Sequence, residues 1–435
     1  MRPLVCDAEI LQFSAAVEES KRQMTQVLNV IFGGIDGNVG KGLVLATFRV
    51  FNKLHQRLPS GIKQLCLPFV RKASNTIRKN LNLIYPSVFI FEGLEKDSGE
   101  PFTFAYSGFY DLDAEYWGQA ILLQGHKRRL LGRMPIWRVA SILETSCPDC
   151  GLALIEHPSW AMSLLPRGGF RIPHWVNMSL DLSKPIEHLF GNQRTFLKGK
   201  IKKNNLSYKM ANDLKSFDDF YNNMFLPYIQ QRHGSLALLD SYKDLLDIFQ
   251  KGELIFVLKG EEAISAGLIE FSKGQVRFRR LGVRGAKLEY VKLGAIGAMY
   301  YFLAMEMIKR GYRRMNVGGT RPLLSDGVTR FKSFLRTEVL MGNEHSCLWT
   351  WFLKDSTALR RFLVNNPFIF MDQKGKPCGA FFFETDPKSS TEALEGIARK
   401  WGFEGLHQRR LFNFDKFNRS NPHSVALEPI KSMAA

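Results

Sequence analysis

The sequence predicts an α/β (α+β) protein with two domains, each built on a central mixed, mostly antiparallel sheet flanked by helices, preceded by basic amphipathic helices. The 435 residues suffice for two or three domains at roughly 100–200 residues each. Hydrophobic residues make up 45% of the chain and charged residues 23%, which is typical of a globular protein. From residue 88 onward, short β-rich runs alternate with stretches of helical periodicity.

The chain carries a large and unevenly distributed positive charge. Sixty Lys and Arg against 41 Asp and Glu give a net charge of +19. Residues 41–82 hold nine Lys or Arg and residues 191–210 hold six, and neither stretch contains an acid. Such clustering indicates a polyanionic partner, namely lipid headgroups, nucleic acid or a phosphate-bearing ligand. The alternative is a basic face that only contacts water.

Residues 1–82 read as a basic amphipathic helical region. Helices are expected at 8–30 and 43–58, and in the second an apolar face stands beside a basic stripe formed by Arg49, Lys53 and Arg57. Such a helix suits the interface of an anionic membrane, here through residues 41–82, although the same face could pack on the protein. No apolar run is long enough to span a bilayer, and the acidic N-terminus does not resemble a secretion signal. We therefore expect a cytoplasmic protein.

Residues 83–200 are expected to form the first domain. Strands are predicted at 88–92 and 102–107 around a polar turn, followed by a helix at 113–123 and a basic run at 126–129. Further strands are predicted near 137–142, 152–155 and 175–180, with a basic segment at 194–209. Cys147 and Cys150 form a CxxC pair, but a structural zinc site needs four ligands, so we expect no metal.

Residues 201–385 are expected to form the second domain, and 386–435 a polar C-terminal tail. Helices at 217–232 and 241–250 precede three closely spaced strands at 254–258, 264–271 and 276–283. A helix at 296–310 ends at Gly311 and leads to a strand at 314–317. A helix at 326–335 and strands at 339–341 and 348–352 complete the domain.

This order of elements, together with three sequence stretches, resembles the GNAT acyltransferases. The stretches are Arg280–Val283, Tyr290–Ala298 and Gly311–Gly319. The basic segment Asp181–Lys203 and the stretch Asn316–Leu335 are similar to the FemAB and CelD-like branch of that superfamily. The resemblance covers roughly residues 85–355 and is strongest over 180–340.

The resemblance implies a Gly-rich turn between a strand and a long helix, whose free N-terminal amides hold a pyrophosphate. Unpaired N–H groups and the positive end of the helix dipole favour phosphate, and glycine lets the backbone approach it. The alternative is that the same small residues only permit close packing. The residues expected to bind the cofactor, acyl-CoA (acetyl-CoA), are Leu281, Val283, Lys292, Gly294, Ala295, Gly297 and Ala298.

The transfer of an acyl group to an amine requires groups that move protons and stabilise charge. Glu270, Glu289 and Asp326 are the candidate bases, although Asp326 equally suits a helix N-cap. Tyr290 is the candidate acid. Lys332 is a candidate catalytic cation and Arg321 a candidate substrate clamp for phosphate or carboxylate, unless both are solvated surface residues.

The predicted function is therefore N-acyl transfer of groups other than amino-acyl groups to a small-molecule or lipid-linked amine, such as an envelope polysaccharide or cell-wall precursor. The enzyme would lie in the cytoplasm, peripherally on the inner face of the plasma membrane. Phe331 stands where many GNAT enzymes carry a tyrosine that protonates the departing thiolate. This difference leaves room for an acyl carrier other than CoA. The alternatives are an aminoacyl-tRNA-dependent transferase and a non-catalytic binding module on a GNAT scaffold.

Overall fold

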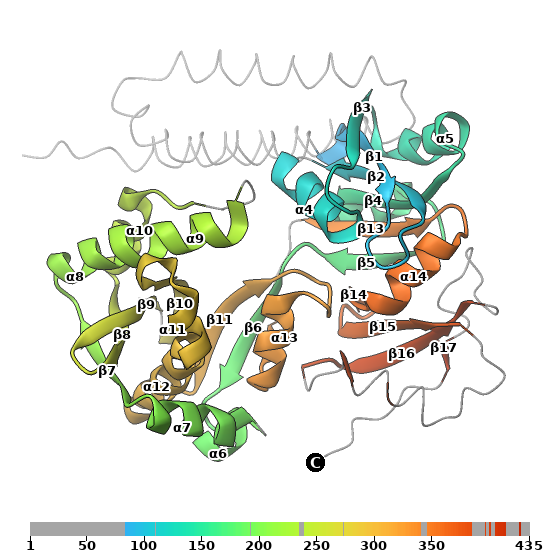
Figure 1. Cartoon of the computed structure of the whole chain (residues 1–435). Coiled ribbons are helices and arrows are strands. Elements are labelled where there is room, and N and C mark those ends of the chain that lie inside the picture. Colours follow the sequence, from blue (N-terminus) through green and yellow to red (C-terminus); the bar gives the residue numbers. More distant parts are fainter. Residues whose placement is uncertain are drawn as a thin grey trace, which may run out of the picture. The chain divides into compact units, whose positions relative to one another are not determined.

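The computed structural model describes residues 83–427, apart from positions 109, 192, 235–238, 273, 341–345, 385–395, 397–399, 402–404 and 415–425. The chain divides into two compact units, Met1–Leu81 and Asn82–Ala435. The helices predicted for residues 1–82 lie outside the described residues. The description below therefore concerns the second unit (Figure 1).

The first sheet has six strands in the order β3-β1-β2-β4-β13-β5. The strands are β1 (Ser87–Leu94), β2 (Pro101–Gly108), β3 (Lys127–Arg133), β4 (Cys150–Pro158), β5 (Gly169–Pro173) and β13 (Ser346–Phe352). Helices α4 (Asp111–Ile121), α5 (Ile136–Ser146) and α14 (Thr357–Asn365) accompany it. Only β2 and β4 are parallel within this sheet; the other pairs are antiparallel.

One prediction in this half was wrong. The stretch predicted as a strand near 137–142 is helix α5, because its buried residues Ile136, Val139 and Leu143 recur at three- and four-residue steps. The basic run at 126–129, for which no element was predicted, overlaps the edge strand β3, which pairs antiparallel with β1. Charged side chains suit an exposed edge strand, because they discourage pairing with other chains.

The second sheet has seven strands in the order β12-β6-β11-β10-β9-β8-β7. The strands are β6 (Val176–Asp181), β7 (Leu206–Ala211), β8 (Gly252–Lys259), β9 (Glu262–Ser272), β10 (Gln275–Val283), β11 (Arg314–Thr320) and β12 (Glu338–Leu340). Its helices are α6 (Ile186–Leu189), α7 (Gln193–Lys203), α8 (Leu214–Asp219), α9 (Leu226–His233), α10 (Tyr242–Phe249), α11 (Leu288–Leu293), α12 (Ala295–Lys309) and α13 (Gly327–Phe334).

Both faces of the second sheet are covered by helices. The apolar helix α12 packs on one face, in a core that includes Ile255, Ile269 and Phe278. The α8 and α10 helices cover the other face of β8 and β9 through Phe217 and Phe249. A π-helical turn, η2 (Phe220–Phe225), connects α8 to α9. The prediction of mixed, mostly antiparallel sheets flanked by helices is therefore confirmed.

A third sheet has four strands in the order β14-β15-β16-β17. They are β14 (Phe368–Met371), β15 (Pro377–Phe383), β16 (Gln408–Asn413) and β17 (Ala426–Leu427). The ring of Phe170 in β5 contacts rings of this sheet, those of Phe368, Phe370, Phe382 and Phe412. The first and third sheets thus share a core. Because β16 and β17 pair with this sheet, the region 386–435 is not only a polar tail.

The predicted boundary between residues 200 and 201 does not separate the sheets. Strand β6, from the first half of the sequence, lies in the second sheet between β11 and β12. Strand β13, from the second half, lies in the first sheet between β4 and β5. Each half therefore supplies an inner strand to the other half's sheet.

Among the described helices, none is long and apolar enough to cross a bilayer.

Candidate functional site

The parallel strands β10 and β11 separate after a short paired stretch. They pair only at Val276–Met315 and Arg277–Asn316, although both strands continue toward their carboxyl ends. Each strand has an irregularity at this level, between Phe278 and Arg280 in β10 and between Asn316 and Gly319 in β11. A bulge bends its strand, so the two strands open into a V. Leu281 and Val283, two of the residues expected to bind the cofactor, lie in the part of β10 beyond its pairing with β11.

The parallel pair of the first sheet does not open in this way. Strands β2 and β4 stay in register from Thr103–Cys150 to Ser107–Ile155, with one irregularity near the start. The parallel pair β15–β16 of the third sheet also stays in register, from Cys378–Gln408 to Phe383–Asn413, so among the described strands β10 and β11 are the parallel pair that separates.

Lys332 of α13 lies at the V. Its Nζ donates hydrogen bonds to the carbonyl oxygens of Gly318 and Gly319 in β11, both at 2.9 Å. Gly318 has a φ of +81°, a left-handed conformation that glycine adopts without strain. The lysine is 3% exposed, and burial lowers its pKa to about 7, against a smaller opposing effect of Asp326. A neutral amine has two N–H donors, which match the two carbonyls, and a lone pair that can accept a proton.

Asp326 caps the same helix. Its Oδ1 accepts hydrogen bonds from the backbone N–H groups of Val328 and Thr329, at 2.9 and 3.0 Å. The alternative interpretation of Asp326, as an N-cap, is therefore the one that the structure supports. Its charge also favours the protonated form of Lys332. Asp326 thus positions α13 and acts on the lysine through space.

The predicted anion cradle at Leu293–Ala298 is covered by α7. A Cβ atom added to Gly297 would overlap the side chain of Leu197, and one added to Gly294 would lie 2.9 Å from the side chain of Lys200. The Nζ of Lys200 donates to the carbonyl oxygen of Lys292 at 2.8 Å. The two glycines therefore permit close packing of α7, which was the alternative interpretation of this pattern.

The other residues predicted to bind the cofactor have varied surroundings. Ala295 and Ala298 are buried in the core, at 0% and 1% exposure, so their side chains do not face a ligand. Lys292 is exposed at the end of α11. Leu281 and Val283 of β10 pair with Gly267 and Ser265 of β9. The opposite edge of β10 faces the V.

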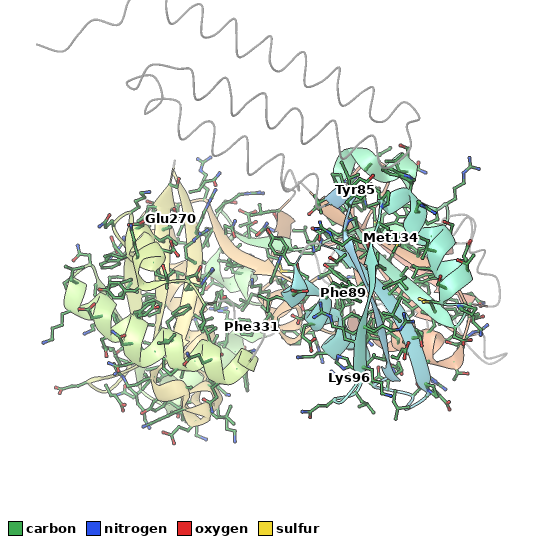
Figure 2. All side chains as sticks on the ribbon, turned by 90° about the horizontal axis from the view of Figure 1, so that it is seen from above. Tyr85, Phe89, Lys96, Met134, Glu270 and Phe331 are labelled. Carbon is green, nitrogen blue, oxygen red and sulfur yellow. The ribbon has the colours of Figure 1, made fainter. Side chains whose placement is uncertain are left out.

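Glu270 and Tyr290 already have partners away from Lys332. Glu270 faces Arg277 across the ladder, and its Oε2 lies 3.6 Å from Arg279 Nε. The Tyr290 hydroxyl donates to Glu262 Oε1 at 2.7 Å, and this hydrogen bond raises the pKa of Tyr290. A raised pKa makes Tyr290 a weaker acid than an ordinary tyrosine. Figure 2 shows that Glu270 and Phe331, the neighbour of Lys332, lie apart in the second half.

Arg321, which directly follows β11, belongs to a buried polar cluster. Its Nη2 lies 2.7 Å from Asp113 Oδ1 of α4, and its guanidinium stacks between the rings of Tyr116 and Trp175. The His174 imidazole continues the cluster, with Nδ1 3.9 Å from Asp113 Oδ2 and Nε2 3.3 Å from Glu156 Oε1. The predicted clamp is therefore engaged by a carboxylate of the chain itself.

The cluster adjoins the V. Trp175, which stacks on Arg321, is also the nearest neighbour of Gly319, whose carbonyl accepts from Lys332. The Tyr106 hydroxyl of β2 is fully buried and has no hydrogen-bond partner within the described part of the chain. Burial, Glu156 and Asp113 raise the pKa of Tyr106, so the phenol remains a donor. The carboxyl ends of β2, β4 and β11 thus meet at one polar site.

The second sheet combines a three-strand antiparallel meander, β8 to β10, with a helix, α12, that leads to a parallel strand, β11, diverging from β10. This is the arrangement that the sequence resemblance implied. The fold is GNAT-like. No protein-family model matches the sequence, and no curated protein matches it.

Several solved structures are similar to this GNAT-like chain at low sequence identity. The structure of L-PGS from Bacillus licheniformis has 11% identity and a TM-score of 0.31, over 65% of this chain and 87% of the other. FemX has 12% identity and a TM-score of 0.33, over 59% and 83%. A tandem GNAT protein from the clavulanic acid biosynthesis pathway has 10% identity and a TM-score of 0.27, over 60% and 82%.

Sequence reasoning missed four members of the site of this GNAT-like chain: Tyr106, Asp113, Glu156 and His174. They come from β2, α4, β4 and the link between β5 and β6, and no local motif joins them. One usable signal was Asp113, an acid in the first turn of a helix at a position facing the core.

Cys147 and Cys150 are both buried free thiols, and no metal-binding group occurs among the described residues.

Proposed function

We propose that the chain is an N-acyltransferase that moves an acyl group from acyl-CoA, or a similar carrier, to an amine. The proposal rests chiefly on one observation, the V between β10 and β11 with the buried amine of Lys332 beside it. Backbone N–H groups along an opened strand suit the polarisation of a donor carbonyl. A lysine with a pKa of about 7 suits proton transfer near neutral pH.

The reaction would proceed by attack of a neutral amine on the donor carbonyl. The new C–N bond forms, the C–S bond of the thioester breaks, and the proton of the attacking nitrogen passes to Lys332. The departing thiolate then takes a proton from Lys332 or from water. The acceptor amine would bind beside the polar cluster, whose carboxylates Asp113 and Glu156 favour a cation.

We propose an amine of an envelope polysaccharide or cell-wall precursor, free or lipid-linked, as the acceptor. A lipid-linked acceptor would agree with a peripheral position on the inner face of the plasma membrane, held by the basic residues 41–82. Partition of the full chain with anionic vesicles, with and without residues 1–82, tests this part. Binding that is unchanged by the truncation would contradict it.

An aminoacyl-tRNA donor is the second candidate, and one observation favours it. Leu197 and Lys200 of α7 occupy the space over Gly294 and Gly297, where a CoA pyrophosphate was expected. With an aminoacyl-tRNA donor, the amine attacks the ester carbonyl, the ester C–O bond breaks, and the tRNA ribose hydroxyl leaves. The six Lys and Arg of residues 191–210 would then contact phosphates, and binding should weaken steeply with salt.

Native mass spectrometry of the full chain tests the donor directly. Acetyl-CoA and aminoacylated tRNA are offered separately, each with glucosamine as the acceptor, and the acylated product is measured. We expect product from one donor, and a loss of about 100-fold or more in kcat for Lys332→Met. The control is Lys354→Met, at an exposed lysine paired with Asp149. Neither binding nor product with either donor would favour the non-catalytic scaffold.

A further inference from the structure

Helices α7 and α11 form a single lysine-rich surface. Lys200 Nζ of α7 donates to the Lys292 carbonyl of α11 at 2.8 Å. Asn204 Nδ2 donates to the Leu293 carbonyl at 3.0 Å. These bonds hold the two helices against each other, and Figure 1 shows both in the same half of the chain as α12. Any ligand that meets one helix can therefore meet the other.

The inner and outer sides of α7 differ sharply. Leu197 is buried against α12 and Ile201 packs on the same core. Lys198, Lys202 and Lys203 point outward and are exposed, and none has an acidic partner within the described residues. Lys292 adds an exposed cation from α11, where Glu289 is the exposed acid. The outer surface is therefore strongly positive.

Two large apolar side chains stand among these lysines. Phe196 of α7 is 56% exposed and Leu288 of α11 is 62% exposed. Phe196 lies one turn before Lys200, whose Nζ is 4.7 Å from the ring centroid, and Leu288 lies one turn before Lys292. A single exposed apolar residue is common. Here each lies one turn from a residue of the Lys200–Lys292 contact, so both helices carry an exposed apolar side chain close to lysines.

We propose that this lysine–apolar face, formed by Phe196, Lys198, Lys202 and Lys203 of α7 with Leu288 and Lys292 of α11, docks the protein on an anionic membrane surface. Phenylalanine and leucine enter the boundary between headgroups and acyl chains, while the lysines remain among the anionic headgroups. Nucleic acid fits less well, because Leu288 offers neither a stacking ring nor a hydrogen bond to a base. The face lies outside residues 41–82 and includes neither Lys332 nor the residues of the V.

The test is co-sedimentation of the full chain with phosphatidylglycerol–phosphatidylcholine vesicles. Phe196→Ser combined with Leu288→Ser removes the apolar anchors without changing charge, and should weaken binding about ten-fold. Lys198→Glu, Lys202→Glu and Lys203→Glu together should weaken it by about 100-fold or more. Every variant keeps residues 41–82 unchanged, so the ratios compare chains that differ only at this face.

Matched controls use exposed residues elsewhere. Leu214→Ser changes a leucine that is 61% exposed in α8, and Lys354→Glu reverses a charge that is 56% exposed. Both should bind vesicles as the unchanged chain does, and each variant's thermal unfolding is checked for an intact fold. The proposal is overturned if the serine pair binds normally. It is also overturned if the variants lose tRNA binding but keep vesicle binding.

Discussion

Arg321 Nη2 lies 2.7 Å from Asp113 Oδ1, and this ion pair joins the residue after β11 of the second sheet to helix α4 of the first. Both side chains are nearly buried, at 11% and 12% exposure. The pair is therefore both a part of the polar cluster and a link between the two halves of the fold.

Removal of either partner should be costly, because the other charge remains buried. We expect Arg321→Met and Asp113→Asn each to lower the free energy of unfolding by about 3 kcal/mol or more. The double variant should cost clearly less than the sum. Urea denaturation measures all three. Asp111→Asn, which breaks the exposed pair with Arg128, is the control and should cost less than about 1 kcal/mol. If Asp111→Asn lowered the free energy of unfolding as much as Arg321→Met or Asp113→Asn does, the result would contradict a buried Arg321–Asp113 pair.

Lys332 should make stability depend on pH in one direction. Burial lowers the pKa of its folded form from 10.5 to about 7, so above pH 7 the unfolded chain binds a proton that the folded chain has released. Stability contributed by this group therefore rises from pH 7 toward pH 10 and is lost as the pH falls. Relative to Lys332→Met, the natural chain should gain roughly 2–3 kcal/mol between pH 7 and pH 9.

The comparison requires urea unfolding of both chains at several pH values, because groups common to both cancel in the difference. Lys354→Met provides a matched change at an exposed lysine. If the difference between the natural chain and Lys332→Met stays constant from pH 7 to pH 9, the buried amine does not titrate in this range. Its assignment as the proton acceptor would then fail as well.

Asp326 should act through its cap rather than as a base. Asp326→Asn keeps an oxygen that can accept from Val328 and Thr329, whereas Asp326→Ala removes it. We expect the alanine variant to lose about 1–2 kcal/mol in thermal or urea unfolding, and the asparagine variant much less. In the proposed transfer reaction, Asp326→Asn should retain most of kcat. A loss of kcat with Asn as large as with Ala would restore Asp326 as a catalytic base.

Gly297 should be required for packing against α7. Gly297→Ala places a methyl group against the terminal Cδ2 of Leu197. The overlap should cost about 1–3 kcal/mol, offset by about 1 kcal/mol of gained helix propensity. Leu197→Ala in the same chain removes the overlap, so the double variant should cost less than the sum of the two single changes. Urea unfolding of the four chains checks this. If Gly297 instead served an anion, the second substitution would give no rescue.

Much of the fold was predictable because its signals are local. The closely spaced strands β8 to β10 and the apolar helix α12 follow directly from their hydrophobic patterns. Asp326 has the residue type and position of a helix cap, and Lys332 lies on the helix that it begins. These predictions needed only neighbouring residues.

The site was less predictable because its geometry depends on distant residues. Gly294 and Gly297 give the same sequence signal for anion binding and for close helix packing, and only the position of Leu197 decides between them. His174 gains its significance from Asp113 and Glu156, which belong to separate elements. The exchange of β6 and β13 between the sheets also leaves no mark in the hydrophobic pattern of either strand.

The placement of β13 between β4 and β5 has a consequence for biosynthesis. Both neighbours leave the ribosome long before β13 does, since 190 residues separate Glu156 from Ser346. At about 5–20 residues per second, the nascent chain waits on the order of 10–40 s with two unsatisfied strand edges. Newly made protein is therefore at risk of edge-to-edge association during this interval, and chaperones that shield such edges should raise its yield.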